Sequence, residues 1–205
     1  IALLLIDVAG RPMNVLTPGF QADLAECIQR IATDAAVRGV VIGSAKSSFM
    51  AGADIKDMVG AYDRGITAAE ASKFSYQLSS LLRRLETCGK PVAAAINGVA
   101  LGGGFEVALA CHYRVIADEP KAGVGLPEVK IGLLPGGGGT QRVPRLVGVT
   151  EALKLITEGR QLSPADALKK GLVHEVAPRD AIVERARQWI LKGGEGVQPW
   201  DKKGF

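Results

Sequence analysis

Short apolar segments alternate with amphipathic helical segments along this 205-residue chain, and this alternation restricts the fold more than any other feature. Runs such as 40–42 and 113–117 have the length of buried strands, whereas 17–34 and 68–86 place apolar residues at helical spacing. Such an alternation is typical of an α/β domain, in which helices cover a sheet. We therefore predict one α/β domain over residues 1–192.

Local signals predict the remaining elements. Thr17 followed by Pro18 is a typical helix start, because Thr caps the first turn and Pro suits the first helical position. Further strands are expected at 1–8, 91–96 and 173–176, and further helices after the glycines 102–104, at 140–146, at 151–157, from Ser163-Pro164 and at 178–191. The segment 43–57 is predicted as a loop, and residues 193–205 as a linker-like tail.

The composition disfavours several classes of function. Aromatic residues make up only 5% and the net charge is only +4, so we expect no nucleic-acid partner. No apolar run is long enough for a membrane span. The three cysteines form no C-x-x-C pair and are interpreted as buried thiols of a reducing compartment, which is the cytoplasm, or mitochondria or peroxisomes in a eukaryote. The two histidines lack metal-ligand spacing and are interpreted as structural, so no metal site is expected.

Two glutamates stand out because each lies in a glycine-rich, apolar segment. Glu106 is the only charged residue in the segment 97–111, and Glu128 lies in the segment 125–135. A carboxylate in such surroundings is costly unless it is paired or used, so the two are candidates for an acid/base pair. Structural alternatives stay open: a solvated position on the helix for Glu106, and a helix-capping acid for Glu128.

Other motifs in the chain bear on phosphate and acyl chemistry. The glycines 102–104 are either a tight turn or a set of N–H donors that face a developing oxyanion. The segment 60–65 has phosphate-loop spacing, but Ile66 stands where Lys is required. Neither a G-x-G-x-x-G strand-to-helix turn nor a G-x-S-x-G nucleophile motif occurs. Nucleotide-binding and serine-hydrolase functions are therefore not supported.

Three segments in order resemble the enoyl-CoA hydratase (crotonase) family. They are 50–56, 90–111 and 126–142, and the resemblance extends from Ile6 to about Ala186. The resemblance implies an α/β fold in which strand-strand-helix repeats form a spiral with two roughly perpendicular sheets, followed by helices. It also implies an acyl-CoA thioester as substrate and no separate cofactor, because CoA is part of the substrate.

The same resemblance implies the residues of the binding site. The thioester oxygen would lie between the backbone N–H groups of Ala53 and Gly103, which form an oxyanion hole. The loop that begins at Ala51 would hold the CoA group. The implied substrate-binding residues are Ala51, Ala53, Asp54, Ile55, Lys56 and Gly103. For Lys56, a contact with the CoA phosphates and a merely exposed position are both consistent with the sequence.

Glu106 and Glu128 match the two catalytic carboxylates of the family. The resemblance implies hydration of trans-2-enoyl-CoA to 3-hydroxyacyl-CoA in fatty-acid β-oxidation, with one water held between the two groups. It assigns the base role to Glu106 and the acid role to Glu128. Two carboxylates in one site do not ionise independently, but the residues alone leave open which one is protonated.

Two features indicate a piece of a longer protein. The segment 197–205 resembles the exit from the hydratase region of multifunctional β-oxidation proteins. The chain begins at Ile1 inside an apolar run and is shorter than a complete hydratase, so we expect truncation before the family's C-terminal helices. We expect a trimer-based homo-oligomer or a part of a multifunctional β-oxidation protein.

Two alternative functions remain. One is a Δ3-Δ2-enoyl-CoA isomerase or another acyl-CoA enzyme of the same fold, which a 3-enoyl-CoA substrate would distinguish. The other is a non-enzymatic acyl-CoA-binding or RNA-binding module. The modest net charge of +4 and the two glutamates disfavour this second alternative.

Overall fold

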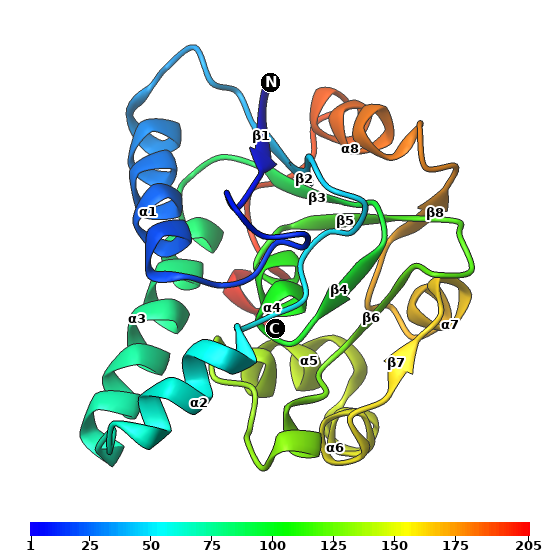
Figure 1. The fold of residues 1–205 in the computed structure, drawn as a ribbon. Helices are drawn as coiled ribbons and strands as arrows, with labels where there is room; N and C mark the ends of the chain where they lie inside the picture. Colours follow the sequence, from blue (N-terminus) through cyan, green and yellow to red (C-terminus); the bar gives the residue numbers. More distant parts are fainter.

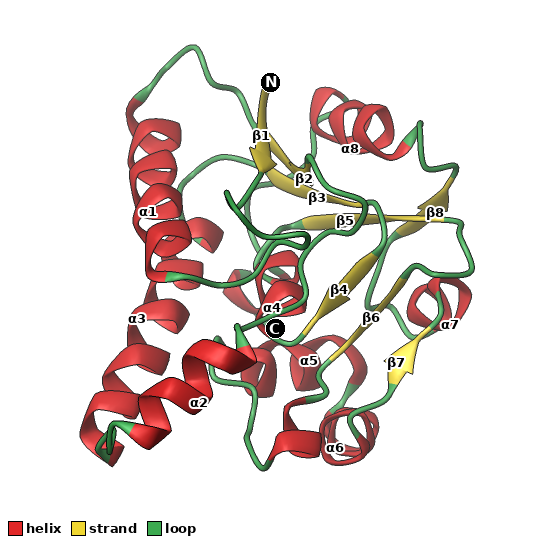
Figure 2. Ribbon diagram, viewed as in Figure 1, coloured by secondary structure: helices red, strands yellow, loops and turns green.

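The computed structural model describes residues 1–205 and contains two sheets with helices around them (Figure 1). All strands of the large sheet are parallel, in the order β1-β2-β3-β5-β8. The small sheet has the order β4-β6-β7, with β7 antiparallel to β6, and its strands run in another direction (Figure 2). The strands are β1 (Ala2–Ile6), β2 (Val40–Ser44), β3 (Val92–Ile96), β4 (Val99–Leu101), β5 (Tyr113–Ala117), β6 (Gly123–Gly125), β7 (Gln161–Leu162) and β8 (Glu175–Ala177).

Helices occupy most of the connections between strands. They are α1 (Pro18–Thr33), α2 (Ile55–Asp63), α3 (Ala68–Glu86), α4 (Gly103–Leu109), α5 (Gly139–Val147), α6 (Val149–Glu158), α7 (Pro164–Lys169) and α8 (Ile182–Leu191), with short 3-10 helices η1 (Glu128–Ile131) and η2 (Pro199–Asp201). No helix is both long enough and apolar enough to cross a membrane.

The chain repeats a strand-strand-helix unit. β3 and β4 precede α4, and β5 and β6 precede η1 and α5. In each unit the first strand joins the large sheet and the second joins the small sheet. The predicted α/β class and the two sheets are therefore confirmed.

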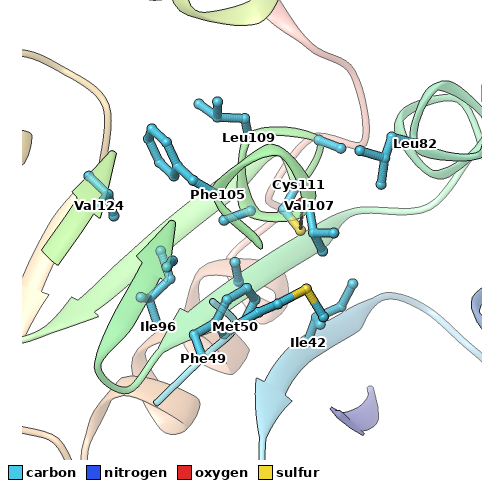
Figure 3. Packing of buried hydrophobic residues seen from close by; sticks show 14 of the residues in the cluster. Ile42, Phe49, Met50, Leu82, Ile96, Phe105, Val107, Leu109, Cys111 and Val124 are labelled. Carbon is cyan, nitrogen blue, oxygen red and sulfur yellow. Dashed lines mark hydrogen bonds between the residues drawn. The ribbon is translucent and has the colours of Figure 1, made fainter. Parts of the chain in front are cut away.

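The strands of the large sheet bury both of their faces, as parallel strands covered by helices do. Val41, Ala93 and Val115 face α8, whereas Val40, Ile42 and their neighbours face the main core. Side chains from β2, β3, α3, α4 and β6 meet in that main core around α4 (Figure 3). Helix α4 is thus held on all sides, which matters because it carries Glu106.

Several predicted elements agree with the structure and several were missed. The helix 68–86 and the strand 113–117 are confirmed, and Thr17 caps α1 as expected. The predicted loop 43–57 is wrong at both ends. Gly43 and Ser44 belong to β2, and Asp54 caps α2, where it accepts a hydrogen bond from the Lys56 N–H at 2.9 Å. Strands β4, β6 and β7 are only two or three residues long, too short to show an alternating pattern.

The prediction of a linker-like tail is corrected by the packing of residues 193–205. Gln198 is 1% exposed, and its amide nitrogen lies 3.2–3.4 Å from the carbonyl oxygens of Leu109, the last residue of α4, and of Ala110 and Cys111. Asp201 accepts hydrogen bonds of 2.8 and 2.6 Å from Arg83.

The three cysteines were predicted as buried thiols. Only the thiol of Cys111 is fully buried; those of Cys27 and Cys88 are half-buried.

Candidate active site

Three chain segments run side by side where the small sheet ends, and this arrangement brings the predicted site residues together. Strand β4 pairs with β6 in parallel, with Leu101 opposite Gly125. Met50 forms an isolated parallel bridge to Ala100, and the Leu101 N–H donates to the Met50 carbonyl at 3.0 Å. The residues that follow each segment therefore lie next to one another, and they include Ala53, Gly103, Glu106 and Glu128.

Glycine allows the first turn of α4 to form against its neighbours. Gly102 has a φ of 53°, in the left-handed region that favours glycine. A Cβ atom on Gly103 would overlap the Leu16 side chain, and one on Gly104 would overlap the Met50 carbonyl. The glycines therefore form the tight turn that the sequence suggested, and the turn leaves N–H groups at the start of the helix free of helical acceptors.

Glu106 points from the first turn of α4 into a buried cradle of glycines. It is 1% exposed, and its Oε1 accepts a hydrogen bond of 2.7 Å from the Gly139 N–H. A Cβ atom on Gly137 would lie only 2.6 Å from Glu106 Oε2, so only glycine fits there. The solvated position considered for Glu106 is thus excluded.

Glu128 begins η1 and lies against the same turn. A Cβ atom on Gly102 would lie 3.3 Å from Glu128 Oε1, and one on Gly103 would lie 3.8 Å from Glu106 Oε2. The two carboxyl groups therefore flank adjacent residues of one glycine turn. Glu128 Oε2 is buried without a hydrogen-bond partner.

The pKa values of both carboxyl groups are raised, and the groups that oppose or add to the rise differ between them. Burial raises the pKa of Glu106 above its ordinary value of 4.5, and backbone N–H donors of the segment 137–139 and the charge of Arg142 oppose this rise. Burial, with repulsion from Glu106, raises the pKa of Glu128 to about 7. The pKa of Glu128 therefore lies near neutral pH, whereas backbone hydrogen bonds to Glu106 favour its ionised form against the larger effect of burial.

The Ala53 and Gly103 N–H groups lie on adjacent segments. A Cβ atom on Gly52, whose φ is 90°, would lie 3.4 Å from the Gly103 nitrogen. The Gly103 N–H is the first of α4, and neither it nor the Ala53 N–H donates to a loop or side-chain acceptor. Two neighbouring N–H groups without acceptors, one of them at a helix start, can stabilise an anionic oxygen.

The rest of the predicted binding loop has structural contacts as well. The Ala51 N–H donates to the Asn14 carbonyl at 2.9 Å, and Asp54 forms a 2.6 Å ion pair with Arg11 besides capping α2. The Ile55 and Lys56 side chains are exposed at the start of α2. Fixed at both ends in this way, the loop presents a defined backbone next to Gly103.

Both histidines bond to the backbone, as a structural role requires. His112 Nδ1 accepts from the Val92 N–H at 3.0 Å and Nε2 lies 3.0 Å from the Glu86 carbonyl, while His174 Nδ1 accepts from the Arg114 N–H at 3.1 Å. No group of three or more His, Cys, Asp or Glu side chains is arranged to hold a metal ion.

Two buried charged residues, Glu86 and Arg142, were not predicted from the sequence. They lie next to the glycines 137–139 that surround the Glu106 carboxyl group. Glu86 follows Leu82 by four residues and therefore lies on the same apolar face of α3. This helical spacing could have predicted that Glu86 is buried. These two residues form an ion pair next to the segment 137–139.

Known proteins resemble the whole of this chain. Residues 2–195 match the family model described as Enoyl-CoA hydratase/isomerase. The fatty acid oxidation complex subunit alpha of Shewanella sp. (strain ANA-3) is 45% identical over 203 residues, which are 98% of this chain but 28% of that protein. The subunit alpha of Shewanella loihica is 48% identical over 94% of this chain and 27% of its own length. The chain thus spans little more than a quarter of these relatives.

Solved structures agree with the family match. An enoyl-CoA hydratase from Bacillus anthracis is 36% identical, with a TM-score of 0.78 over 87% of this chain and 67% of that one. DspI of Pseudomonas aeruginosa is 30% identical, with a TM-score of 0.83 over 93% of this chain and 70% of that one. The fold is therefore the crotonase fold, and the chain belongs to the enoyl-CoA hydratase/isomerase family.

Proposed function

We propose that this chain adds water to trans-2-enoyl-CoA thioesters and yields 3-hydroxyacyl-CoA, as the hydration step of fatty-acid β-oxidation. One observation carries the proposal: Glu106 and Glu128 flank one glycine turn in opposite hydrogen-bonding environments. Family membership and the fatty-acid oxidation subunits among the relatives support the substrate class.

In the proposed reaction one water lies between the two carboxyl groups. Ionised Glu106 takes a proton from this water as the water oxygen bonds to the β-carbon of the substrate. The electrons of the double bond move toward the thioester oxygen, and protonated Glu128 gives its proton to the α-carbon. The pKa of Glu128, raised to about 7 by burial, suits a group that starts protonated and ends ionised near neutral pH.

The thioester oxygen carries negative charge while the α-carbon waits for its proton. In the proposal the N–H groups of Ala53 and Gly103 stabilise this charge, each by about 3 kcal/mol in comparable sites. The loop from Ala51 to Lys56 holds the CoA group through its backbone, with the exposed Lys56 side chain available to the phosphates. CoA enters as part of the substrate, and the proposed chemistry uses no other cofactor.

We further propose that the chain is the hydratase region of a longer fatty-acid oxidation protein. The support is that the fatty acid oxidation subunits align with 98% of this chain over only 28% of their own length. Assembly into a trimer-based homo-oligomer and a cytoplasmic location stay predictions.

Loss of the absorbance of the conjugated thioester of crotonyl-CoA tests the proposed reaction. We expect turnover by the unmodified chain, and a fall of about 10²- to 10⁴-fold in both Glu106→Gln and Glu128→Gln, because each loses one proton-transfer group. Calorimetric binding of the saturated analogue butyryl-CoA should be kept in both variants. Full turnover after either substitution would remove that residue from the mechanism.

An isomerase is the second candidate, because the matching family includes isomerases. It predicts that a 3-enoyl-CoA shifts its double bond much faster than crotonyl-CoA is hydrated. If neither reaction occurs and the chain binds RNA in a salt-sensitive way, a binding module becomes the better description.

A further inference from the structure

A buried ion pair lies directly behind the glycine cradle of Glu106. Arg142 of α5 donates from Nε to Glu86 Oε1 of α3 at 2.7 Å, and the two side chains are 7% and 2% exposed. Ions this deeply buried are costly unless their geometry is good and their remaining polar atoms are satisfied. The pair joins two helices through residues that lie 56 positions apart in the sequence.

Two further polar atoms of the pair also form hydrogen bonds. Arg142 Nη1 donates to the Gly137 carbonyl at 2.8 Å, and Glu86 Oε2 accepts from Arg83 at 3.1 Å. A Cβ atom on Gly138 would overlap the Arg142 guanidinium, so the segment passes directly over it. The guanidinium is therefore fixed by Glu86 on one side and fixes the backbone of Gly137 on the other.

The segment held by Arg142 is the one that holds Glu106. The Gly139 N–H, two residues after the carbonyl bound by Arg142, donates to Glu106 Oε1 at 2.7 Å. The charged groups that face Glu106 are Arg142 of α5 and Glu128 of η1. The positive charge of Arg142 lowers the pKa of Glu106, against the larger effect of burial.

We propose that Arg142, itself held by Glu86, is a positioning residue that fixes the segment 137–139 and thereby orients the Glu106 carboxylate toward the reacting water. This inference rests on the proposed function for its effect on turnover, but its effect on Glu106 is measurable without any substrate. Arg142 touches neither the water nor the thioester in this role; it acts through the Gly137 carbonyl and the Gly139 N–H.

The test separates positioning from stability by removing one charge and then both. Arg142→Met leaves Glu86 buried with only Arg83 as a partner, so the melting temperature should fall. The double variant Arg142→Met/Glu86→Gln also removes the unpaired charge of Glu86, so most of the lost melting temperature should be recovered. We expect kcat for crotonyl-CoA to stay about 10²-fold low in both variants, with KM changed less than about threefold, because Glu106 is misplaced in both.

A second measurement needs no turnover. The ¹³C shift of the Glu106 carboxyl group, assigned by its absence in Glu106→Gln, is followed against pH. In the double variant we expect its midpoint to move to higher pH by about one unit, chiefly because the aligned Gly139 N–H donor is lost; the removal of the Glu86 charge offsets part of the loss of the nearer Arg142 charge. Arg145→Met, on the exposed face of the same helix, is the matched control and should leave both readouts unchanged.

Recovery of kcat together with the melting temperature in the double variant would overturn the proposal, and so would an unchanged Glu106 titration. If the double variant does not fold, Arg142→Lys replaces it, because Lys keeps the charge but lacks the planar fork that binds two acceptors. A Glu106 titration and kcat equal to those of the unmodified chain in Arg142→Lys would also overturn it. Absent turnover in the unmodified chain would overturn the proposed function alone, since the titration still decides the positioning role.

Discussion

At the scale of single residues, surroundings turn two identical carboxyl groups into different chemical groups. Glu106 is the more deeply buried, yet backbone N–H donors and Arg142 stabilise its ionised form. Glu128 has a buried oxygen without a partner, and its pKa rises to about 7. The two carboxyl groups thus lie in different electrostatic surroundings, as the proposed acid and base roles require.

The raised pKa of Glu128 predicts a pH dependence of stability. Because its pKa rises from 4.5 to about 7 on folding, the folded chain binds more protons in this window, and the free energy of unfolding falls as pH rises through it. Urea unfolding of the unmodified chain and of Glu128→Gln at pH 5 and pH 7 measures the effect. We expect the variant to lose less stability between the two pH values; an equal loss in both would contradict the raised pKa.

At the scale of elements, α4 is a short helix that packs so closely against its neighbours that parts of it have no room for a side chain. All seven of its residues are buried, and it begins without a side-chain cap after the left-handed Gly102. Its position depends on the close approach of the segment at Met50 to the glycine at its second position. Small residues here serve packing first, and the free N–H groups of the turn follow from that packing.

Gly104→Ala should therefore destabilise the chain although Ala is the better helix former. Its Cβ atom would overlap the Met50 carbonyl, and overpacking of this kind costs about 1 to 3 kcal/mol. Gly19→Ala in α1 is the matched control: its Cβ atom would lie 3.7 Å from Thr17 Oγ1, an ordinary contact, so it should be neutral or stabilise by up to about 1 kcal/mol. Thermal unfolding of both variants checks the opposite signs, and equal effects would refute the packing argument.

At the scale of the whole molecule, the C-terminal segment completes the core instead of leaving it. Gln198 inserts its amide at the end of α4, where the last carbonyl groups of the helix lack helical partners. Asp201 joins the same segment to α3 through Arg83. The far end of the helix that carries Glu106 is thus closed by residues about 90 positions later in the chain.

Gln198→Ala should lower the free energy of unfolding by about 1 to 3 kcal/mol, because it removes the side-chain donor from the buried carbonyl groups of Leu109 and Ala110. Gln77→Ala, at an exposed position of α3, removes the same side chain and should change stability little. Chemical denaturation of the two variants gives the comparison. Equal stability of Gln198→Ala and the unmodified chain would mean that water replaces the amide.

The sequence alone determined those features that depend on near neighbours. The Thr17-Pro18 start of α1, the 68–86 helix and the 113–117 strand carry local capping or periodicity signals, and the structure confirms them. The resemblance to the family came from ordered local motifs in the same way. Helix α2 was not predicted, because the Gly- and Ala-rich residues that precede it are typical of a loop. Only the structure shows that Asp54 caps its first turn.

Only the tertiary structure decided the surroundings of the two glutamates. β6 reads Gly-Val-Gly and becomes a strand by pairing with β4, which is what sets Glu128 beside the α4 turn. The Gly139 donor lies 33 residues from Glu106, and Arg142 lies 56 residues from Glu86. Residue type determines which groups can titrate, whereas their pKa values and orientation depend on burial and on hydrogen bonds across such distances, which form only when the chain folds.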